Sequence, residues 1–480
     1  MAGFMVDMPA APAADPAPRR SGSVARVVIL AGVAIFFAWA VYGHRLGLND
    51  EKYLYRNWRH LPAFPLYWQA AAGAIPFFLG QWLFGRRPEA VYTALTLVTL
   101  SSIGIMVVCT FEQDRRLGSN RIEDMVTSQT ANGFFEEAAR LDVSGLGIRR
   151  WLATYPQRVP QQVGHANSKP PGPILFNYLV VRFFGDGRLA ANVAGLFMAI
   201  LAAVSVPATY AFIGCFTRSV RAAFLGASFM ALSPSLMLFY PQFDQFYPVL
   251  TAGLAILWAA ALRTNRFRYA AAHGVLFGVT TFINYLPCVL GLFLIGYALL
   301  YWLEHPAMGV RRILAQAAVA IGAFVGFYLV LWLASGFDPI ATLRACWPQV
   351  SLFNQWLAVS GYPPRRLPGT IPWDLWGFAM GSGWIGFVLA GCYFVRLKFS
   401  NSWATWQARI ATLCVAQFVL EATTGLIQGE TERLWIFMMP MLMLPIGLEL
   451  ASWSLGERMT AYGALLVLTI LICQNITFLA

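Results

Sequence analysis

Charged side chains of this 480-residue chain gather in a few polar segments between apolar stretches as long as membrane spans. Residues 111–172 form the longest polar segment, and its carboxylates could act as a general base on a hydroxyl group, a role that needs a carboxylate held near the reacting oxygen. Glu112 and Asp114 directly follow an apolar stretch whose helix could hold them rigidly, and Asp124 comes shortly after. The alternative is an exposed loop in which acidic and basic groups solvate one another.

The same segment ends in the sequence GHANSKPPGPILFNYLVVRFFG. Its prolines fix the backbone where an apolar helix begins, and Pro173 suits the first turn of that helix. Lys169 would then lie at the boundary between membrane and water, where a cation can bind a lipid phosphate. A lysine that only anchors a helix at the interface is the alternative. His165 could hydrogen-bond the same phosphate or be solvated.

Three further acidic positions have apolar or aromatic neighbours. Asp244 lies in the turn FYPQFDQFYP, where aromatic faces could bind a sugar, although a turn aspartate beside an aromatic belt is an equal alternative. Glu421 falls inside an apolar stretch, where a lone charge costs at least about 2.5 kcal/mol, so we expect a function or a partner on a neighbouring helix. Glu430 and Arg433 follow in the turn QGETER and could line an outward-facing cavity above Glu421.

The composition excludes an ordinary soluble enzyme. Hydrophobic residues make up 58% of the chain and charged residues only 12%, whereas soluble domains contain about 25% charged residues. The net charge of +12 does not indicate a nucleic-acid partner, because basic cytoplasmic loops of a membrane protein give the same excess. The seven cysteines are dispersed without a CxxC motif, which favours buried thiols over a disulfide or zinc framework.

The apolar stretches predict an all-α polytopic membrane protein with about thirteen transmembrane helices. They cover residues 27–43, 66–85, 90–110, 189–216, 222–240, 245–262, 270–286, 288–303, 313–334, 376–395, 410–427, 434–451 and 459–479. Residues 174–184 are too short for a span and predict a re-entrant or interfacial helix. A cytoplasmic N-terminus places the basic short loops on the cytoplasmic side, as the positive-inside rule requires.

This topology predicts a disordered cytoplasmic tail, residues 1–25, and one transmembrane domain, residues 26–480. The first outer loop (residues 111–172) carries the candidate catalytic groups, a second outer loop covers residues 335–374, and the C-terminus lies outside. Within the first loop, the sequence NGFFEEAARL predicts an amphipathic surface helix, which could lie in the membrane interface through three apolar side chains. These are Phe134, Phe135 and Leu141.

Three motifs resemble the GT-C membrane glycosyltransferases, in particular the relatives of protein O-mannosyltransferases and of lipid A aminoarabinose transferases. KPPGP, a short aromatic-apolar helix and FFG are similar to the segment that follows the family's first outer loop. ALSPSLMLFYPQFDQFYP resembles a family span that ends in a proline-containing turn with an acidic residue, and GETERLWIFMMP resembles a late motif of some bacterial members. The resemblance implies a GT-C-like fold in the cell inner membrane and a polyprenyl-phosphate-linked sugar as donor.

The activity implied by the resemblance is an inverting transfer of a hexosyl or pentosyl group on the outer face of the membrane. The acceptor would be a hydroxyl group of a lipid, a glycan or a protein. An outer-loop carboxylate would deprotonate this hydroxyl, while Lys169 and nearby Arg149 or Arg150 would stabilise the phosphate as the carrier leaves. Side chains around Asp244 would position the sugar or the prenyl chain.

One departure from the family concerns the base. Family members commonly carry an aspartate a few residues before the first surface helix, whereas residues 129–132 of this chain read QTAN and offer no carboxylate. We therefore expect the base at Asp114 or Asp124, with Glu112 and Glu123 as further candidates.

A secondary transporter or lipid flippase that performs no chemistry is the rival interpretation. It would use Glu421 and the outer acidic loop to bind an ion or a substrate. Transporters favour paired broken helices at the midplane and short loops, whereas this chain concentrates its unusual residues in outer segments, so we favour the transferase. No cofactor is predicted. The interpretation allows a divalent cation, but the sequence gives no support for one, because no cluster of ligands can be recognised.

Overall fold

The computed structural model describes residues 23–42, 57–58, 65–113, 120–129, 133–359 and 367–477. Nearly all elements in these ranges are helices, and the one sheet among them is a two-residue antiparallel pair of β1 (Asn57–Trp58) with β2 (Ile476–Thr477). The predicted all-helical fold is therefore confirmed. Asp114 and residues 1–22 of the predicted tail lie outside the described residues, as does part of the second outer loop.

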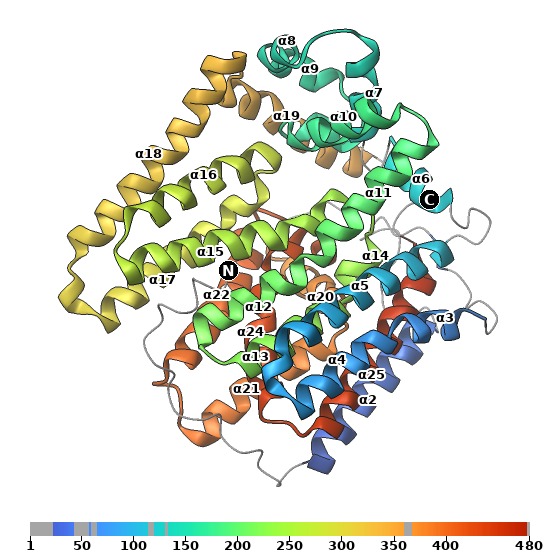
Figure 1. Cartoon of the computed structure of the whole chain (residues 1–480), viewed down its shortest axis with the longest axis vertical. Coiled ribbons are helices and arrows are strands. Elements are labelled where there is room, and N and C mark those ends of the chain that lie inside the picture. The colour runs from blue at the N-terminus through green and yellow to red at the C-terminus, as the bar shows by residue number, and fades with distance from the viewer. Residues whose placement is uncertain are drawn as a thin grey trace.

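The first third of the chain supplies a group of apolar helices and the outer loop. Before the loop come α2 (Ser23–Tyr42), α3 (Pro65–Gly73), α4 (Ile75–Arg86), η1 (Pro88–Ala90) and α5 (Val91–Gln113). The loop and the helix that ends it contain α6 (Asn120–Thr127), α7 (Phe134–Val143), α8 (Ile148–Ala153), α9 (Tyr155–Arg158), η2 (Val159–Gln161), η3 (Gly164–Ser168) and α10 (Gly172–Phe184). In Figure 1 the helices α7 to α10 form a cap at one end of the long apolar helices.

The middle of the chain contains α11 (Arg188–Ala203), α12 (Ser205–Thr217), α13 (Val220–Ala231), α14 (Pro234–Leu238), η4 (Phe243–Phe246), α15 (Tyr247–Thr264), α16 (Phe267–Ile283), η5 (Leu286–Leu290), α17 (Gly291–Glu304), η6 (Pro306–Met308), α18 (Val310–Ser335) and α19 (Pro339–Val359). Of these, α19 packs on α9, η2 and η3 of the cap. The last helices are α20 (Ile371–Gly381), α21 (Ile385–Ser400), α22 (Trp406–Thr424), α23 (Thr431–Leu434), η7 (Trp435–Met438), α24 (Met439–Ala451) and α25 (Leu455–Asn475).

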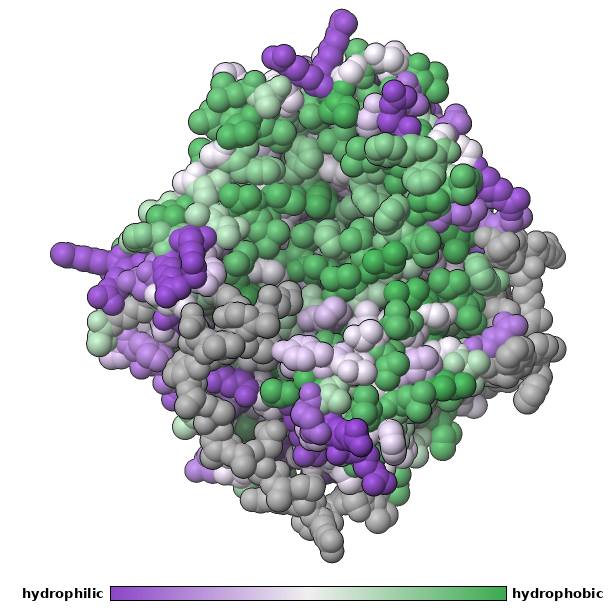
Figure 2. Space-filling view, in the orientation of Figure 1, coloured by the Kyte–Doolittle hydropathy of each residue, from purple (hydrophilic) through white to green (hydrophobic). Residues whose placement is uncertain are grey.

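Seven helical segments of the described chain are long and apolar enough to cross a membrane, and α20 with α21 gives an eighth if this bent pair is one span. Hydrophobic residues cover much of the middle of the face in Figure 2, and hydrophilic residues gather toward its margins. These features are those of a membrane protein. The larger count of about thirteen spans and the predicted sidedness stay predictions.

Of the predicted spans that the structure divides into two helices, two have a clear local cause. Residues 222–240 form two helices, because α13 ends at Ala231 and Pro234, which cannot donate a helical hydrogen bond, begins α14. Residues 376–395 cross the 102° bend between α20 and α21, where Gly383 and Trp384 have φ values of 66° and 56°. A positive φ ends an α-helix, so the chain turns there.

The predicted surface helix of the outer loop exists as α7 and packs on α10. Its side chains Phe134, Phe135 and Leu141 are buried against the protein. The expectation that they lie in the membrane interface is therefore wrong, because the apolar face of α7 packs on α10 of the same chain. This contact holds the outer loop against the ends of the apolar helices.

Glycines allow α13 and α24 to pack with their backbones close together. A Cβ atom added to Gly226 would lie 2.6 Å from the Met443 carbonyl oxygen and 2.4 Å from Ile213 Cδ1. One added to Gly447 would lie 2.3 Å from the Ala222 carbonyl oxygen. Small residues at such crossings are the usual means of close helix packing in membranes.

We predict that Gly226→Ala lowers the free energy of unfolding by about 1–3 kcal/mol, because the added methyl group overpacks this crossing. Unfolding in mixed detergent micelles measures the change. Gly463→Ala on α25 is the matched control, since nothing lies within 4 Å of its added Cβ. Equal stability of the two variants would contradict the packing account.

Candidate functional site

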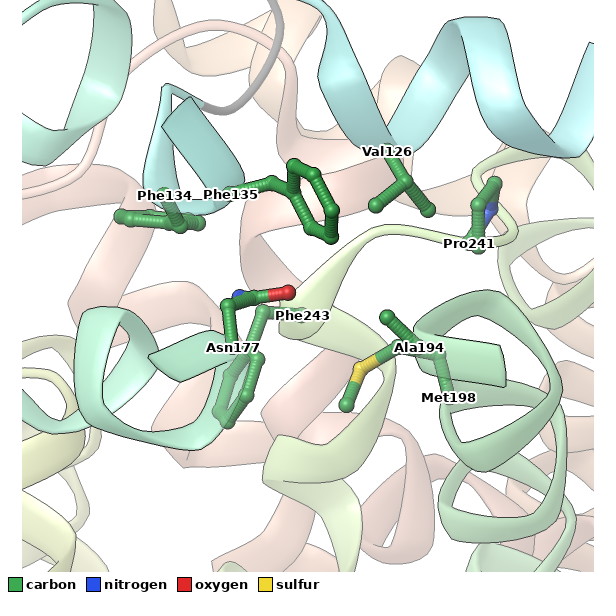
Figure 3. Close-up of a pocket in the computed structure, with 8 residues that line it drawn as sticks. All are labelled: Val126, Phe134, Phe135, Asn177, Ala194, Met198, Pro241 and Phe243. Carbon is green, nitrogen blue, oxygen red and sulfur yellow. The ribbon is translucent and has the colours of Figure 1, made fainter. Parts of the chain in front are cut away.

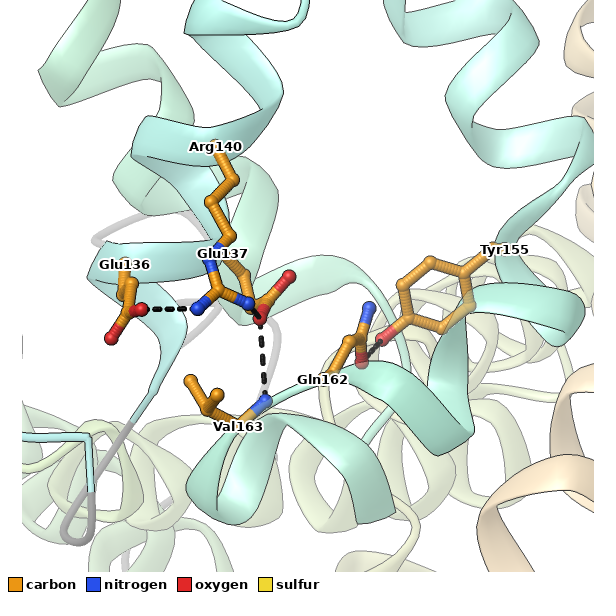
Figure 4. Close-up of polar contacts among 6 residues, drawn as sticks. All are labelled: Glu136, Glu137, Arg140, Tyr155, Gln162 and Val163. Carbon is orange, nitrogen blue, oxygen red and sulfur yellow. Dashed lines mark hydrogen bonds and ion pairs between the residues drawn. The ribbon is translucent and has the colours of Figure 1, made fainter.

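The outer loop is folded around a set of side-chain contacts just before Lys169 (Figure 4). Glu137 on α7 accepts hydrogen bonds from Arg140 Nη1 at 2.9 Å and from the Val163 backbone N–H at 3.3 Å. Burial raises the pKa of Glu137, while the bond from Val163 opposes that rise. These contacts tie α7 to the turn that leads to Lys169.

The backbone of Lys169 is held from two sides. The buried Tyr155 hydroxyl donates to the Lys169 carbonyl oxygen at 2.8 Å and also lies 3.4 Å from Gln162 Oε1. The Cys346 thiol of α19 donates to the same carbonyl at 3.5 Å. Lys169 itself is extended, as expected for a residue that precedes proline.

Gly172 brings this segment against the end of α16. A Cβ atom at Gly172 would lie only 2.7 Å from the Phe282 carbonyl oxygen and 3.0 Å from Ile283 Cα. A larger residue would force α10 and α16 apart. The close approach sets Lys169 beside Asn284, the residue at which α16 ends.

The Lys169 ammonium group has no carboxylate partner within the described part of the chain. Its one hydrogen bond there joins Nζ to Asn284 Oδ1 at 3.4 Å, which is long for a charged donor. Burial lowers the pKa of Lys169 below its ordinary value of 10.5, with the charge of Asp244 opposing that shift. The side chain is half-buried, so it stays within reach of a ligand.

A second cation, Arg433, lies near Lys169 and is paired with two carboxylates. Arg433 Nη2 contacts Glu430 Oε2 at 2.6 Å, and Arg433 Nη1 lies 3.6 Å from Asp244 Oδ2. All three side chains are buried, and their charges act on Lys169. We call Lys169, Asp244, Glu430 and Arg433 the charged cluster.

His165 adjoins the charged cluster and is half-buried. Burial, together with the positive charge of Arg433, lowers its pKa to about 4. The imidazole is therefore neutral at pH 7, so it can offer a hydrogen bond and no positive charge.

The turn that carries Glu430 and Arg433 is fixed from below by two buried carboxylates. Glu421 accepts from the Ile427 backbone N–H at 3.0 Å, and Asp374 accepts from the Gly429 N–H at 2.7 Å. Glu430 follows with a left-handed backbone, φ 51°, which is uncommon for a residue other than glycine. Glu421 thus makes a contact in the turn after its own helix, where sequence reasoning expected a cavity floor or a partner on another helix.

Other predicted site residues lie apart from the charged cluster. Asp124 is exposed and forms an ion pair with Arg121 at 2.9 Å on its own helix. Arg149 and Arg150 are exposed on α8. No hydrogen bond or ion pair in the described ranges joins these three to the cluster. Side-chain contacts of Glu112 lie outside the description, as does all of Asp114.

A small apolar pocket lies among α6, α7, α10 and α11, next to η4 (Figure 3). It is lined by Val126, Phe134, Phe135, Asn177, Ala194, Met198, Pro241 and Phe243. Phe243 and Asp244 are neighbours in η4: Phe243 lines the pocket, whereas Asp244 belongs to the charged cluster. Of the aromatic residues around Asp244, Phe243 therefore faces the pocket and Tyr247 contacts Asn284.

Sequence reasoning missed Asn284, which is buried and contacts both Lys169 and Tyr247. A lone asparagine in the short link between two apolar stretches was its only signal. No group of three or more His, Cys, Asp or Glu side chains in the described ranges could hold a metal ion. The seven cysteines are free thiols.

Comparison of the chain with protein-family models finds no match, and comparison with curated proteins finds none either.

We predict that Arg433→Gln lowers the free energy of unfolding by about 3–5 kcal/mol, because it leaves two buried carboxylates without their cation. Thermal or detergent-induced unfolding measures the loss. Arg188→Gln, which breaks an exposed pair with Glu123, should cost at most about 1 kcal/mol. Similar losses in the two variants would contradict the importance of the buried pairs.

Proposed function

We propose that the protein is a GT-C-like membrane glycosyltransferase that moves a sugar from a polyprenyl-phosphate carrier to an acceptor hydroxyl. The observation that carries this proposal is Lys169, a half-buried ammonium group that has no ion pair in the described ranges. Even partial burial of a cation is costly unless a counter-ion accompanies it. A ligand phosphate would supply that counter-ion.

The net charge of the charged cluster suits a ligand that carries one negative charge, such as a phosphodiester. Two cations, Lys169 and Arg433, face two carboxylates, Asp244 and Glu430, so the cluster is neutral when all four are ionised. A sugar phosphodiester adds one negative charge beside the free ammonium group. Apolar helices next to the cluster suit the prenyl chain of such a lipid.

In the proposed reaction the protein binds the carrier phosphate and stabilises its charge as the sugar leaves. Lys169 would hold a phosphate oxygen, and Arg433 would add a positive field from a guanidinium group kept in place by two carboxylates. His165, neutral at pH 7, would donate a hydrogen bond. Preorganised donors in a water-poor site stabilise such developing charge strongly.

A location in the inner membrane, with the site on the outer face and the N-terminus in the cytoplasm, belongs to the same proposal. It is supported by the basic short loops of the predicted topology. The acceptor and the sugar are left open.

The transporter alternative has one supporting observation. The pair α20 and α21 is bent by 102° between two apolar helices, and discontinuous helices of this kind bind substrates in transporters. Incubation of purified protein in lipid with radiolabelled polyprenyl-phosphate sugars and crude membrane acceptors separates the two functions. Label transfer supports the transferase, whereas vesicle uptake without label transfer supports the transporter.

We predict that Lys169→Ala weakens binding of polyprenyl phosphate by about 10- to 100-fold, because a charge-assisted bond is lost. Binding is measured by displacement of a labelled carrier from protein in lipid, with the matching polyprenol as the ligand without phosphate. Lys398→Ala, at an exposed lysine on α21, should bind as the wild type does. Unchanged binding by Lys169→Ala would contradict the proposed phosphate site.

We also predict a pH dependence of carrier binding. Because burial lowers the pKa of Lys169, the empty site loses its ammonium proton at a lower pH than an ordinary lysine does. Carrier binding should therefore weaken as the pH rises through this lowered pKa. Lys169→Arg keeps its charge and should bind with less dependence on alkaline pH. Equal pH profiles of the two proteins would argue against a titrating Lys169.

A further inference from the structure

Two hydrogen bonds connect Lys169 through Asn284 to Tyr247, which interacts with Asp244. Lys169 Nζ donates to Asn284 Oδ1 at 3.4 Å, and Asn284 Nδ2 donates to the Tyr247 hydroxyl at 2.6 Å. The Tyr247 hydroxyl interacts with the Asp244 carboxylate, three residues before it in the chain. Because an amide nitrogen only donates, the phenol oxygen accepts from Asn284, and its own proton stays available for Asp244. The two hydrogen bonds from Lys169 through Asn284 to Tyr247 run in one direction and polarise one another.

Asn284 and Tyr247, the two residues between Lys169 and Asp244, are held rigidly. Asn284 and Tyr247 are 2% and 1% exposed. Asn284 Oδ1 also accepts from the Leu286 backbone N–H at 3.0 Å, which fixes the amide group. Buried side chains with several hydrogen bonds hold their partners in a defined geometry, as a catalytic group requires.

Asp244 is the less engaged of the two carboxylates of the cluster. It lies 3.6 Å from Arg433, whereas Glu430 lies 2.6 Å from the same guanidinium group. Its side chain is 11% exposed, so it is not sealed off from its surroundings. By contrast, Asp124 is exposed, and its ion pair with Arg121 lies within its own helix. Its carboxylate is therefore not held in a fixed position by buried partners.

We propose that Asp244 is the general base of the transfer reaction, and that Tyr247 and Asn284 are its positioning residues. This inference rests on the proposed function. It also accounts for the absence of a carboxylate at residues 129–132, because the base would then come from η4 and not from the outer loop.

Asp244 takes the proton of the acceptor hydroxyl while the acceptor oxygen bonds to the anomeric carbon, opposite the phosphate. The bond from that carbon to the phosphate oxygen breaks, and its electron pair leaves with the carrier phosphate toward Lys169 and Arg433. The anomeric configuration inverts. Asp244, now a neutral acid, releases the proton to water.

The test compares full-length variants in lipid for both carrier binding and label transfer. Asp244→Asn should keep polyprenyl-phosphate binding within about threefold of the wild type but lose at least about 100-fold in transfer rate, the usual contribution of a general base. Asp244→Ala should regain part of the transfer when sodium formate supplies an external carboxylate. Asp244→Glu should be more active than Asp244→Asn.

Tyr247→Phe tests the positioning role. It should lower the transfer rate about tenfold and leave carrier binding unchanged, with a shifted pH profile that a purely structural defect would not produce. Asp142→Asn, at a loop aspartate that pairs with the exposed Arg182, is the matched control and should transfer at the wild-type rate. Transfer by Asp244→Asn within tenfold of the wild type, or a 100-fold loss in Asp124→Asn, would overturn this inference alone. A wild-type protein that neither binds carrier nor transfers label would overturn the proposed function as well.

Discussion

The guanidinium group of Arg433, buried between Asp244 and Glu430, is the interaction on which the site depends. Each of these carboxylates would be costly in an apolar interior without a cation. Their pairing joins the turn after α22 to η4, two segments almost 200 residues apart in the chain. Within the charged cluster it leaves Lys169 as the cation without an ion pair to a described carboxylate.

The rest of the architecture brings Lys169 to that buried pair. The apolar face of α7 packs on α10, and Tyr155 and Cys346 hold the Lys169 backbone. Gly172 then lets α10 approach the end of α16. The segment that carries Lys169 is thereby fixed at the ends of apolar helices, where a lipid head group and its chain could be bound together. In such an enclosed place a fixed cation acts more strongly on an anion than it does in water.

Many of the apolar helices could be predicted, because long apolar runs can be recognised in a sequence. The predicted span at residues 288–303, for example, corresponds to the helical segment Leu286–Glu304. Lys169 was recognisable from its KPP motif, and Arg433 from charges among apolar residues. Asn284 was not, since a single asparagine between helices forms no pattern. The exposure of Asp124 could not be foreseen either, because its surroundings are set by packing of the outer loop.

The most direct test of the phosphate site is an experimental structure of the protein in lipid with polyprenyl phosphate bound. If Lys169 binds the phosphate, we expect phosphate density within salt-bridge distance, about 4 Å, of Lys169 Nζ, on the side that faces Arg433. We also expect the prenyl chain to leave the site along the apolar helices. A carrier bound elsewhere, with Lys169 still on Asn284 alone, would contradict the central claim.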